Sequence, residues 1–302
     1  MSNAVLYTRS THRVRYIFKL ISFLAFAYAG IKVLPYLPFA DKFEFEYMAL
    51  GLVAISLLLV REFEKRPAAT LGLAWNAFTT RQFLGGLLLG TFMISFVVAS
   101  MGALHFADFT LVIHTWDEGI KSCAPQLLFF LCAAAVEELV FRGYLYQTAI
   151  EASNTTVATI IFSLLFAVAH GANPGVGVLA YINIFLAGLL FAGAYLRTRQ
   201  LWLPIAIHAS WNFFQGTIYG AEVSGESIGQ HLFSMRSDGP AWITGGAFGP
   251  EAGVLTTVAL LIGIVAVNAV PLFQISPEQY ALSHRVRYGE DRALIFSDEH
   301  TG

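Results

Sequence analysis

The chain has 302 residues, of which 56% are apolar and only 13% are charged, and its formal net charge is −2. Soluble domains carry about 25% charged residues, so this composition excludes an ordinary soluble protein. It indicates an all-α, polytopic membrane protein in which lipid surrounds most of the chain. The slightly negative net charge argues against a nucleic-acid partner.

Eight stretches are expected to cross the membrane as helices, because they are apolar and mostly free of Asp, Glu, Lys and Arg. The first, at about 17–37, contains Lys19 and Lys32 near its two ends, where long side chains can reach the lipid headgroups. The second, at about 47–60, is shorter than the roughly 20 residues that a spanning helix needs. The other six are expected at about 83–104, 126–146, 156–169, 176–196, 201–219 and 252–273.

The basic residues predict how this bundle lies in the membrane. A cluster of arginines precedes the first span, as in a signal peptide, but apolar sequence continues well past the small residues that follow, so an uncleaved first span is expected. With the N-terminus inside, thirteen basic residues fall on the inner side and three on the outer side. The inner residues are Arg9, Arg13, Arg15, Lys19, Arg61, Lys65, Arg66, Arg81, Arg197, Arg199, Arg285, Arg287 and Arg292, and the outer ones are Lys42, Lys121 and Arg236.

This charge bias leads to a prediction of the domain organisation. We expect a multi-pass protein of the plasma (inner) membrane with both termini in the cytoplasm. Residues 1–273 should form the transmembrane bundle, with an outer loop at about 220–251, and residues 274–302 should form a cytoplasmic tail.

Ionisable side chains inside a membrane are rare and usually functional. Besides the two lysines near the ends of the first span, the predicted spans contain Glu137, Glu138, Arg142, His170 and His208, and the neutral Asn212 follows four residues after the last of these. Glu138 and Arg142 are spaced for a helical ion pair, which we interpret as mainly structural. Glu137 points about 100° away from Glu138, so it needs another partner or a water-filled cavity.

One carboxylate, two imidazoles and one amide suit the hydrolysis of an amide bond. Glu137 can take a proton from a water molecule that His170 orients. His208 and Asn212 share one helix face and can both donate to the oxyanion of a tetrahedral intermediate. Phe166 shares a face with His170 and should support it. No Ser or Cys lies beside an obvious base in the sequence, so covalent catalysis has less support.

Three segments resemble the motifs of one protein family. EELVFR (137–142), FAVAH (166–170) and HASWN (208–212) are similar to the EExxxR, FxxxH and HxxxN motifs of the CAAX protease and bacteriocin-processing family. They occur in the family's order, on separate predicted spans within about 120–220, and no motif position departs from the pattern. The resemblance implies a mostly eight-helix, glutamate-dependent intramembrane endopeptidase that needs no cofactor. It assigns the base to Glu137 with His170, and the oxyanion hole to His208 with Asn212.

Other functions remain open at this point. Carboxylate and histidine side chains also form the proton relays of transporters, although no internal repeat is visible here. The family includes bacteriocin self-immunity proteins, so a non-catalytic immunity or scaffold protein is a further alternative. A zinc-dependent protease would use Glu137, His170 and His208 as ligands, although the HExxH motif is absent. For a protease the partner is a peptide or protein, and prenylated C-terminal peptides, leader peptides and membrane-embedded segments are all candidates.

The predicted spans do not place the catalytic residues at one depth. They put His170 near the outer face of the membrane and Glu137 near its middle. If these two residues meet, either a span boundary is wrong by several residues or the helix that leads to His170 is strongly tilted. We expect the boundary to be wrong, because helix ends are the least reliable part of a sequence-based prediction.

Overall fold

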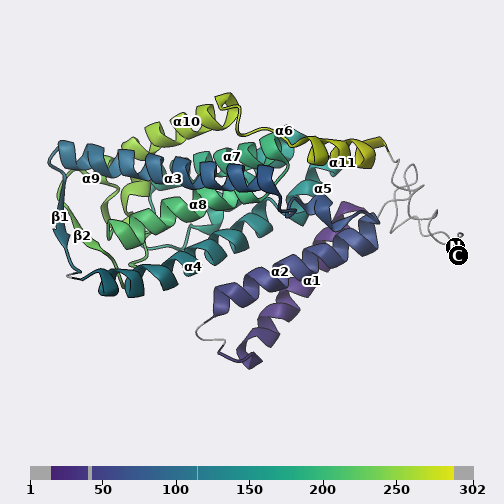
Figure 1. The fold of residues 1–302 in the computed structure, drawn as a ribbon, viewed down its shortest axis with the longest axis horizontal. Helices are drawn as coiled ribbons and strands as arrows, with labels where there is room; N and C mark the ends of the chain where they lie inside the picture. Colours follow the sequence, from purple (N-terminus) through teal and green to yellow (C-terminus); the bar gives the residue numbers. More distant parts are fainter. Residues whose placement is uncertain (1–14, 40–42, 114, 289–302) are drawn as a thin grey trace, which may run out of the picture.

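A computed structural model describes residues 15–39, 43–113 and 115–288 and shows a helical bundle (Figure 1). Each of the eight predicted spans corresponds to a helix, and the predicted fold class, a helical membrane bundle, is confirmed. These helices are α1 (Tyr16–Val33), α2 (Glu44–Leu59), α3 (Ala77–Ala103), α4 (Trp116–Phe141), α6 (Thr155–Ala169), α7 (Val178–Thr198), α8 (Trp202–Phe213) and α10 (Val254–Ala269).

Shorter elements connect these helices. They are α5 (Tyr144–Ala152), α9 (Ala241–Thr244), α11 (Pro277–Tyr288), the 3-10 turns η1 (Leu34–Tyr36), η3 (Ala68–Leu71), η5 (Gly246–Phe248) and η6 (Pro250–Ala252), and the π-helical turns η2 (Val60–Glu64) and η4 (Phe214–Ile218). Strands β1 (Ala107–Leu111) and β2 (Phe233–Ser237) pair antiparallel, with Ala107 opposite Ser237 and Leu111 opposite Phe233. This two-stranded sheet lies outside the predicted spans, and the sequence analysis did not predict it.

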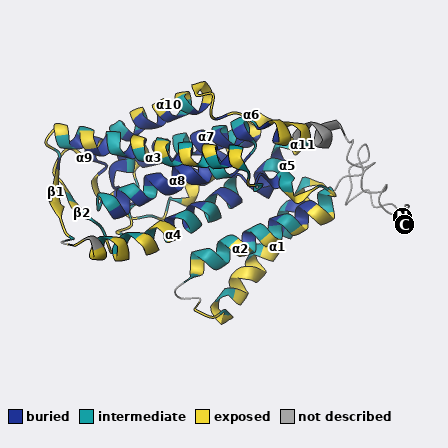
Figure 2. Cartoon of the chain, in the orientation of Figure 1, coloured by how far each residue is buried: buried dark blue, intermediate teal, exposed yellow. Residues whose placement is uncertain are grey.

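Large apolar side chains lie on the outward faces of the helices. Figure 2 shows exposed positions along α3 and α10. On α3, the exposed residues Leu84, Leu88 and Phe92 recur every four residues and so form one stripe. Such surfaces are stable against lipid and unfavourable in water. Within the described residues, four stretches are long and apolar enough to span a membrane: Tyr16–Tyr36, Ala77–Ala103, Asp117–Ala152 and Val178–Thr198. The protein is therefore an integral membrane protein.

Helix α8 lies at the centre of the bundle, packed against α3, α4 and α7. It is buried on nearly every side, because its residues are apolar or small around the whole helix. Gly86 and Gly90 of α3 permit the close approach. A Cβ atom on Gly86 would lie 2.8 Å from the Cβ of Ala206, and one on Gly90 would lie 2.3 Å from the carbonyl oxygen of Ile207. The predicted oxyanion residues are thus carried by the most enclosed helix.

The predicted span at 126–146 is wrong at both ends. Helix α4 begins ten residues earlier, at Trp116, where Thr115 caps it by accepting a hydrogen bond from the backbone N–H of Glu118. Acidic residues in this first turn stabilise the helix, although they end the charge-free stretch in the sequence. At the other end the helix breaks at Gly143 and resumes as α5, which continues to Ala152. A Cβ atom on Gly143 would lie 2.2 Å from the carbonyl oxygen of Leu139, so this break requires glycine.

The two ends of the bundle are built from different secondary-structure elements. One end holds the β1–β2 sheet, α9, η5 and η6, and the other holds α5, α11 and the turn between α7 and α8 (Figure 1). Thirteen basic residues were predicted to face the inner side of the membrane. Those that the structure describes lie in or beside elements of the second end. Arg9, Arg13, Lys42 and Arg292, which also entered the orientation prediction, lie outside the described residues.

The prediction that Lys19 extends to the lipid headgroups is wrong. Lys19 is 4% exposed, and its Nζ lies 2.6 Å from Oε1 of Glu64. The hydroxyl of Tyr144, on α5, donates to the same oxygen at 3.0 Å. A buried ion pair and the Tyr144 hydrogen bond therefore join α1 to η2 and α5, so the ammonium group of Lys19 is satisfied inside the protein.

The predicted tail begins with a segment that packs against the bundle. Asn76, which caps α3, donates to Oε2 of Glu278 at 2.7 Å. The side-chain amide of Gln279 donates to the carbonyl oxygen of Arg199 at 3.1 Å, in the turn between α7 and α8. Helix α11 is thus tied to the same end of the bundle as that turn. Residues 289–302 of the predicted tail lie outside the described residues.

Candidate active site

The corrected helix boundaries bring Glu137 and His170 to the same level. Glu137 lies 15 residues before Ala152, the last residue of α5, and His170 lies 15 residues after Thr155, the first residue of α6. Although the break at Gly143 separates α4 from α5, the equal counts favour a common level, and Oε2 of Glu137 does lie 3.8 Å from Nε2 of His170. The earlier start of α4 and its continuation as α5 show that the predicted boundary was wrong by several residues, as expected.

Glu137 lies between the two histidines. Its Oε2 atom is 3.8 Å from Nε2 of His170 and 3.9 Å from Nε2 of His208. The same oxygen is buried and has no hydrogen-bond partner among the described residues, while the side chain as a whole is 33% exposed. The two distances are too long for direct hydrogen bonds. A carboxylate with free acceptor capacity, placed between two imidazoles, can accept a proton from a bound water molecule.

His170 is held in one orientation by its own helix. Its Nδ1 lies 2.8 Å from the carbonyl oxygen of Phe166, one turn earlier. Since a carbonyl can only accept, Nδ1 carries the proton, and the neutral ring presents its free Nε2 toward Glu137. The ring of Phe166 contacts that of His170 edge-on, with centroids 4.9 Å apart. The FxxxH spacing therefore positions both the ring and its tautomer.

The predicted ion pair between Glu138 and Arg142 is present and also includes His208. Oε1 of Glu138 accepts from Nη1 of Arg142 at 3.0 Å and from Nδ1 of His208 at 3.1 Å. Both members of the ion pair are fully buried, with side chains 0% and 1% exposed. Arg142 also donates to the carbonyl oxygen of Gly188 at 3.1 Å and lies over the ring of Phe166. The pair therefore contacts both α7 and α8, and its carboxylate holds one imidazole of the site.

Phe191, which the sequence analysis did not single out, forms one wall for His208. The two rings are stacked, with centroids 4.8 Å apart and an interplanar angle of 16°. With Nδ1 bonded to Glu138, His208 can also donate from Nε2 only as an imidazolium. The carboxylates of Glu137 and Glu138, on either side of the ring, stabilise that charge.

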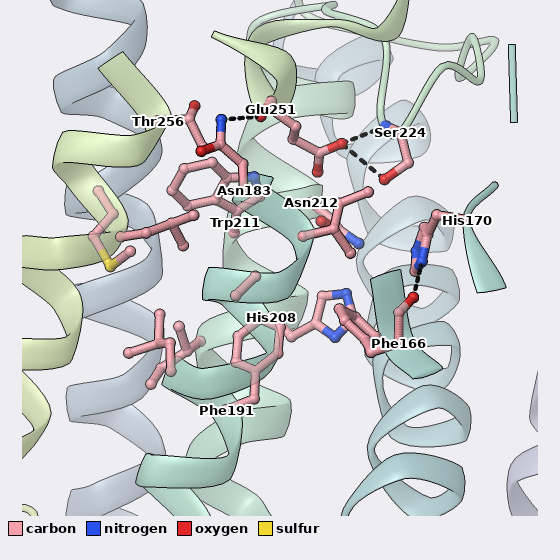
Figure 3. Close-up of a pocket in the computed structure, with 16 residues that line it drawn as sticks. Phe166, His170, Asn183, Phe191, His208, Trp211, Asn212, Ser224, Glu251 and Thr256 are labelled. Atoms are coloured by element: carbon pink, nitrogen blue, oxygen red, sulfur yellow. Dashed lines mark hydrogen bonds between the residues drawn. The ribbon is translucent and has the colours of Figure 1, made fainter. Parts of the chain in front are cut away.

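All four predicted catalytic residues lie in or beside one cavity of about 50 Å³ (Figure 3). His170, His208 and Asn212 line it, and Glu137 reaches the two histidines from the α4 side. The opposite wall is apolar and includes Met93, Leu190 and Leu260. Four polar lining residues were not predicted as part of the site: Asn183, Ser224, Glu251 and Thr256.

The sequence contains a weak signal for these missed residues. Asn183 is a polar residue within an apolar span, and Glu251 lies in GAFGPEAG, one residue before the predicted span at 252–273. A carboxylate at such a boundary is usually solvated, so it received no role. Burial raises the pKa of Glu251, while hydrogen bonds from Ser224 and the imidazoles of His170 and His208 act in the opposite direction.

The zinc alternative uses Glu137, His170 and His208, whose side chains do come together. Within the described residues, however, no group of three or more His, Cys, Asp and Glu side chains has a geometry that could hold a metal ion. Catalytic zinc requires ligand atoms at about 2.0–2.2 Å from the ion. With Nδ1 of each histidine on an acceptor, the neutral rings have a free Nε2, which suits water activation and zinc ligation alike.

Comparisons with known proteins support the motif-based resemblance. The sequence model of the family described as "Type II CAAX prenyl endopeptidase Rce1-like" matches residues 120–214. The chain is also 31% identical over 80 residues to a Bacillus subtilis (strain 168) protein described as "Putative membrane peptidase YdiL". That match covers 26% of this chain and 30% of the relative. The segment at 120–214 contains all three motifs, and over this segment the chain is similar to the CAAX protease family.

Proposed function

We propose that the protein is an intramembrane endopeptidase that hydrolyses a peptide bond with a water molecule activated by Glu137 and His170. The observation that carries this proposal is the position of Glu137 Oε2, 3.8 Å and 3.9 Å from the Nε2 atoms of the two histidines. The motifs lie in a segment that matches the CAAX protease family, which adds support. The substrate is a peptide or protein whose apolar side chains can enter the largely apolar cavity, and lipid-anchored or membrane-embedded segments suit it best.

The reaction follows from the geometry of these four side chains. Glu137 removes a proton from water, while Nε2 of His170 accepts the second water hydrogen and orients the oxygen toward the substrate carbonyl. The oxyanion that forms accepts hydrogen bonds from Nε2 of His208 and the amide of Asn212. Glu137 then gives its proton to the leaving amine, which completes the hydrolysis. Glu138 holds His208 in place throughout.

The test is proteolysis by the purified full-length chain in detergent on a library of internally quenched fluorescent peptides. We expect cleavage that survives prolonged chelation, with less than stoichiometric metal in the active protein, because the proton transfers need only Glu137 and His170. The Glu137→Gln protein serves as the inactive control. Stoichiometric zinc in the wild type, lost in His170→Ala or His208→Ala together with activity, would assign these residues to a metal site instead.

We also propose that both termini face the cytoplasm, because thirteen basic residues belong to one side of the expected topology and three to the other. The end of the bundle with β1, β2 and η6 then faces away from the cytoplasm. In a Cys123→Ser, Cys132→Ser background, a cysteine at the exposed Asp238 should react with a membrane-impermeant maleimide on intact cells. A cysteine at Thr301 should react only after the cells are permeabilised. The reverse pattern would invert the topology.

A further inference from the structure

Glu251 is a carboxylate of the cavity that belongs to none of the three motifs. It lies on η6, just before α10, and Figure 3 shows its side chain above Asn212 at the polar end of the cavity. Its Oε2 accepts from both the backbone N–H and the hydroxyl of Ser224, at 2.6 Å and 2.7 Å. One carboxylate oxygen is therefore held by the loop after η4, and no hydrogen bond from the described part of the chain engages the other, which can meet a ligand in the cavity.

The backbone that carries Glu251 is held in place by α7 and α10. The amide of Asn183, on α7, donates to the carbonyl oxygens of Glu251 and Gly253 at 2.7 Å and 2.9 Å. Thr257 donates to the amide oxygen of Asn183 at 2.6 Å, which fixes the orientation of that amide. Thr256 donates to the carbonyl oxygen of Pro250 at 2.7 Å. Such a network holds the carboxylate at a fixed place in the cavity, as a binding site requires.

The charges around the cavity do not balance. Glu137, Glu138 and Glu251 bring three carboxylates, and Arg142 brings one guanidinium. Arg142 is already paired with Glu138, and no ion pair joins Glu251 to a basic side chain in residues 15–39, 43–113 and 115–288. With neutral imidazoles the surplus is two negative charges, and with one imidazolium it is one. An uncompensated carboxylate in an apolar setting is unfavourable unless a positive group binds beside it.

We propose that Glu251 is an anionic subsite that binds a cationic group of the peptide substrate, either a lysine or arginine side chain or a free amino group, close to the bond that is cleaved. This proposal rests on the proposed function, since it defines a substrate property for the same cavity. Glu251 lines the cavity together with His208 and Asn212, so a cation bound there lies near the oxyanion position. The subsite therefore selects which bond of a peptide reaches the water-activating pair.

Burial of Glu251 is consistent with this role. Its pKa is raised by removal from water, which means that the empty cavity disfavours its charge. A cation in contact with the carboxylate offsets that penalty, so substrate binding and ionisation of Glu251 favour each other. A role confined to holding the Ser224 loop would not require a charge, because a neutral amide oxygen can accept the same two hydrogen bonds.

The experiment compares matched peptides on matched variants. Apolar quenched peptides carry lysine or Nε-acetyl-lysine at one scanned position, and their binding is measured by fluorescence polarisation on the Glu137→Gln protein, so that no peptide is consumed. At one position we expect lysine to bind about 10- to 100-fold more tightly than acetyl-lysine, the range for a hydrogen-bonded charge. Adding Glu251→Gln should reduce this ratio to about one. Adding Glu226→Gln, which removes an exposed carboxylate from the same loop, should leave the ratio unchanged.

Three outcomes would overturn the subsite. They are a ratio near one at every scanned position, a ratio that survives Glu251→Gln (including one that survives because both peptides lose affinity equally), and a ratio that Glu226→Gln also removes. If Glu251→Gln does not fold, peptides with glutamate or glutamine at the same position decide the matter, because glutamate must then bind more weakly than glutamine. Lysine-dependent binding without any cleavage by the wild type would contradict the peptidase proposal alone. Cleavage with no lysine preference would contradict the subsite alone.

Discussion

Glu137→Gln is expected to lower kcat by about 100- to 10,000-fold, because the amide cannot accept a proton from water. The fold should persist, since glutamine is nearly isosteric and Oε2 of Glu137 makes no hydrogen bond that would be lost. Among the described residues Glu137 has no lysine or arginine partner, so removing its charge should leave Tm unchanged or higher. Initial rates on a quenched peptide, with thermal unfolding of the same preparation, measure both effects.

A kcat near that of the wild type would contradict the role of Glu137 as the base. A loss of activity that accompanies a lower Tm would show that the carboxylate is structural. Glu62→Gln is the matched control, because it makes the same chemical change at an exposed site on η2, outside the cavity. This control should change neither the rate nor the Tm.

Arg142→Ala should lower the free energy of unfolding by about 3–5 kcal/mol, the usual effect of breaking a buried ion pair from one side. The substitution leaves the fully buried Glu138 without its cation and also removes the hydrogen bond to the carbonyl oxygen of Gly188. We expect a lower yield and a lower Tm in detergent. His208 should lose its fixed position as well, because Glu138 holds its Nδ1.

Two further variants separate the loss of this buried pair from the effect of removing any arginine side chain. Arg66→Ala breaks an ion pair with Glu151 whose side chains are 14% and 33% exposed, so solvent screens it and the expected loss is up to about 1 kcal/mol. Adding Glu138→Gln to Arg142→Ala should restore part of the lost stability, because the stranded charge is then removed. Equal stability of Arg142→Ala and the wild type would show that the pair contributes nothing.

The sequence predicted the helices because lipid imposes a simple rule on composition: spans are apolar, and the exceptions are functional. It predicted less well where local chemistry overrides that rule. The charged first turn of α4 looked like a loop, although Thr115 and Glu118 cap a helix there. Lys19 looked like a headgroup anchor, although its partner Glu64 lies in a turn 45 residues away along the chain.

The motifs identified the candidate site, but they did not show how its members connect. Glu138 and His208 are 70 residues apart, and only the packing of α4 on α8 reveals that one orients the other. Glu251 was missed for a related reason. Its neighbours Ser224 and Asn183 come from two other segments, so no spacing in the sequence links a boundary carboxylate to the cavity. Patterns within one helix could be predicted from the sequence, whereas contacts between distant segments could not.

The tight turn between α5 and α6 has a consequence for how this chain can change in length. Glu137 and His170 are each counted from that turn, with 15 residues on either side. One inserted or deleted residue in α5 would shift the two side chains by about 1.5 Å and rotate them by about 100° relative to each other. Insertions in the exposed stretch around Gly229 would leave this register intact. In a library of length variants, active chains should therefore accept insertions around Gly229 and reject insertions in α5.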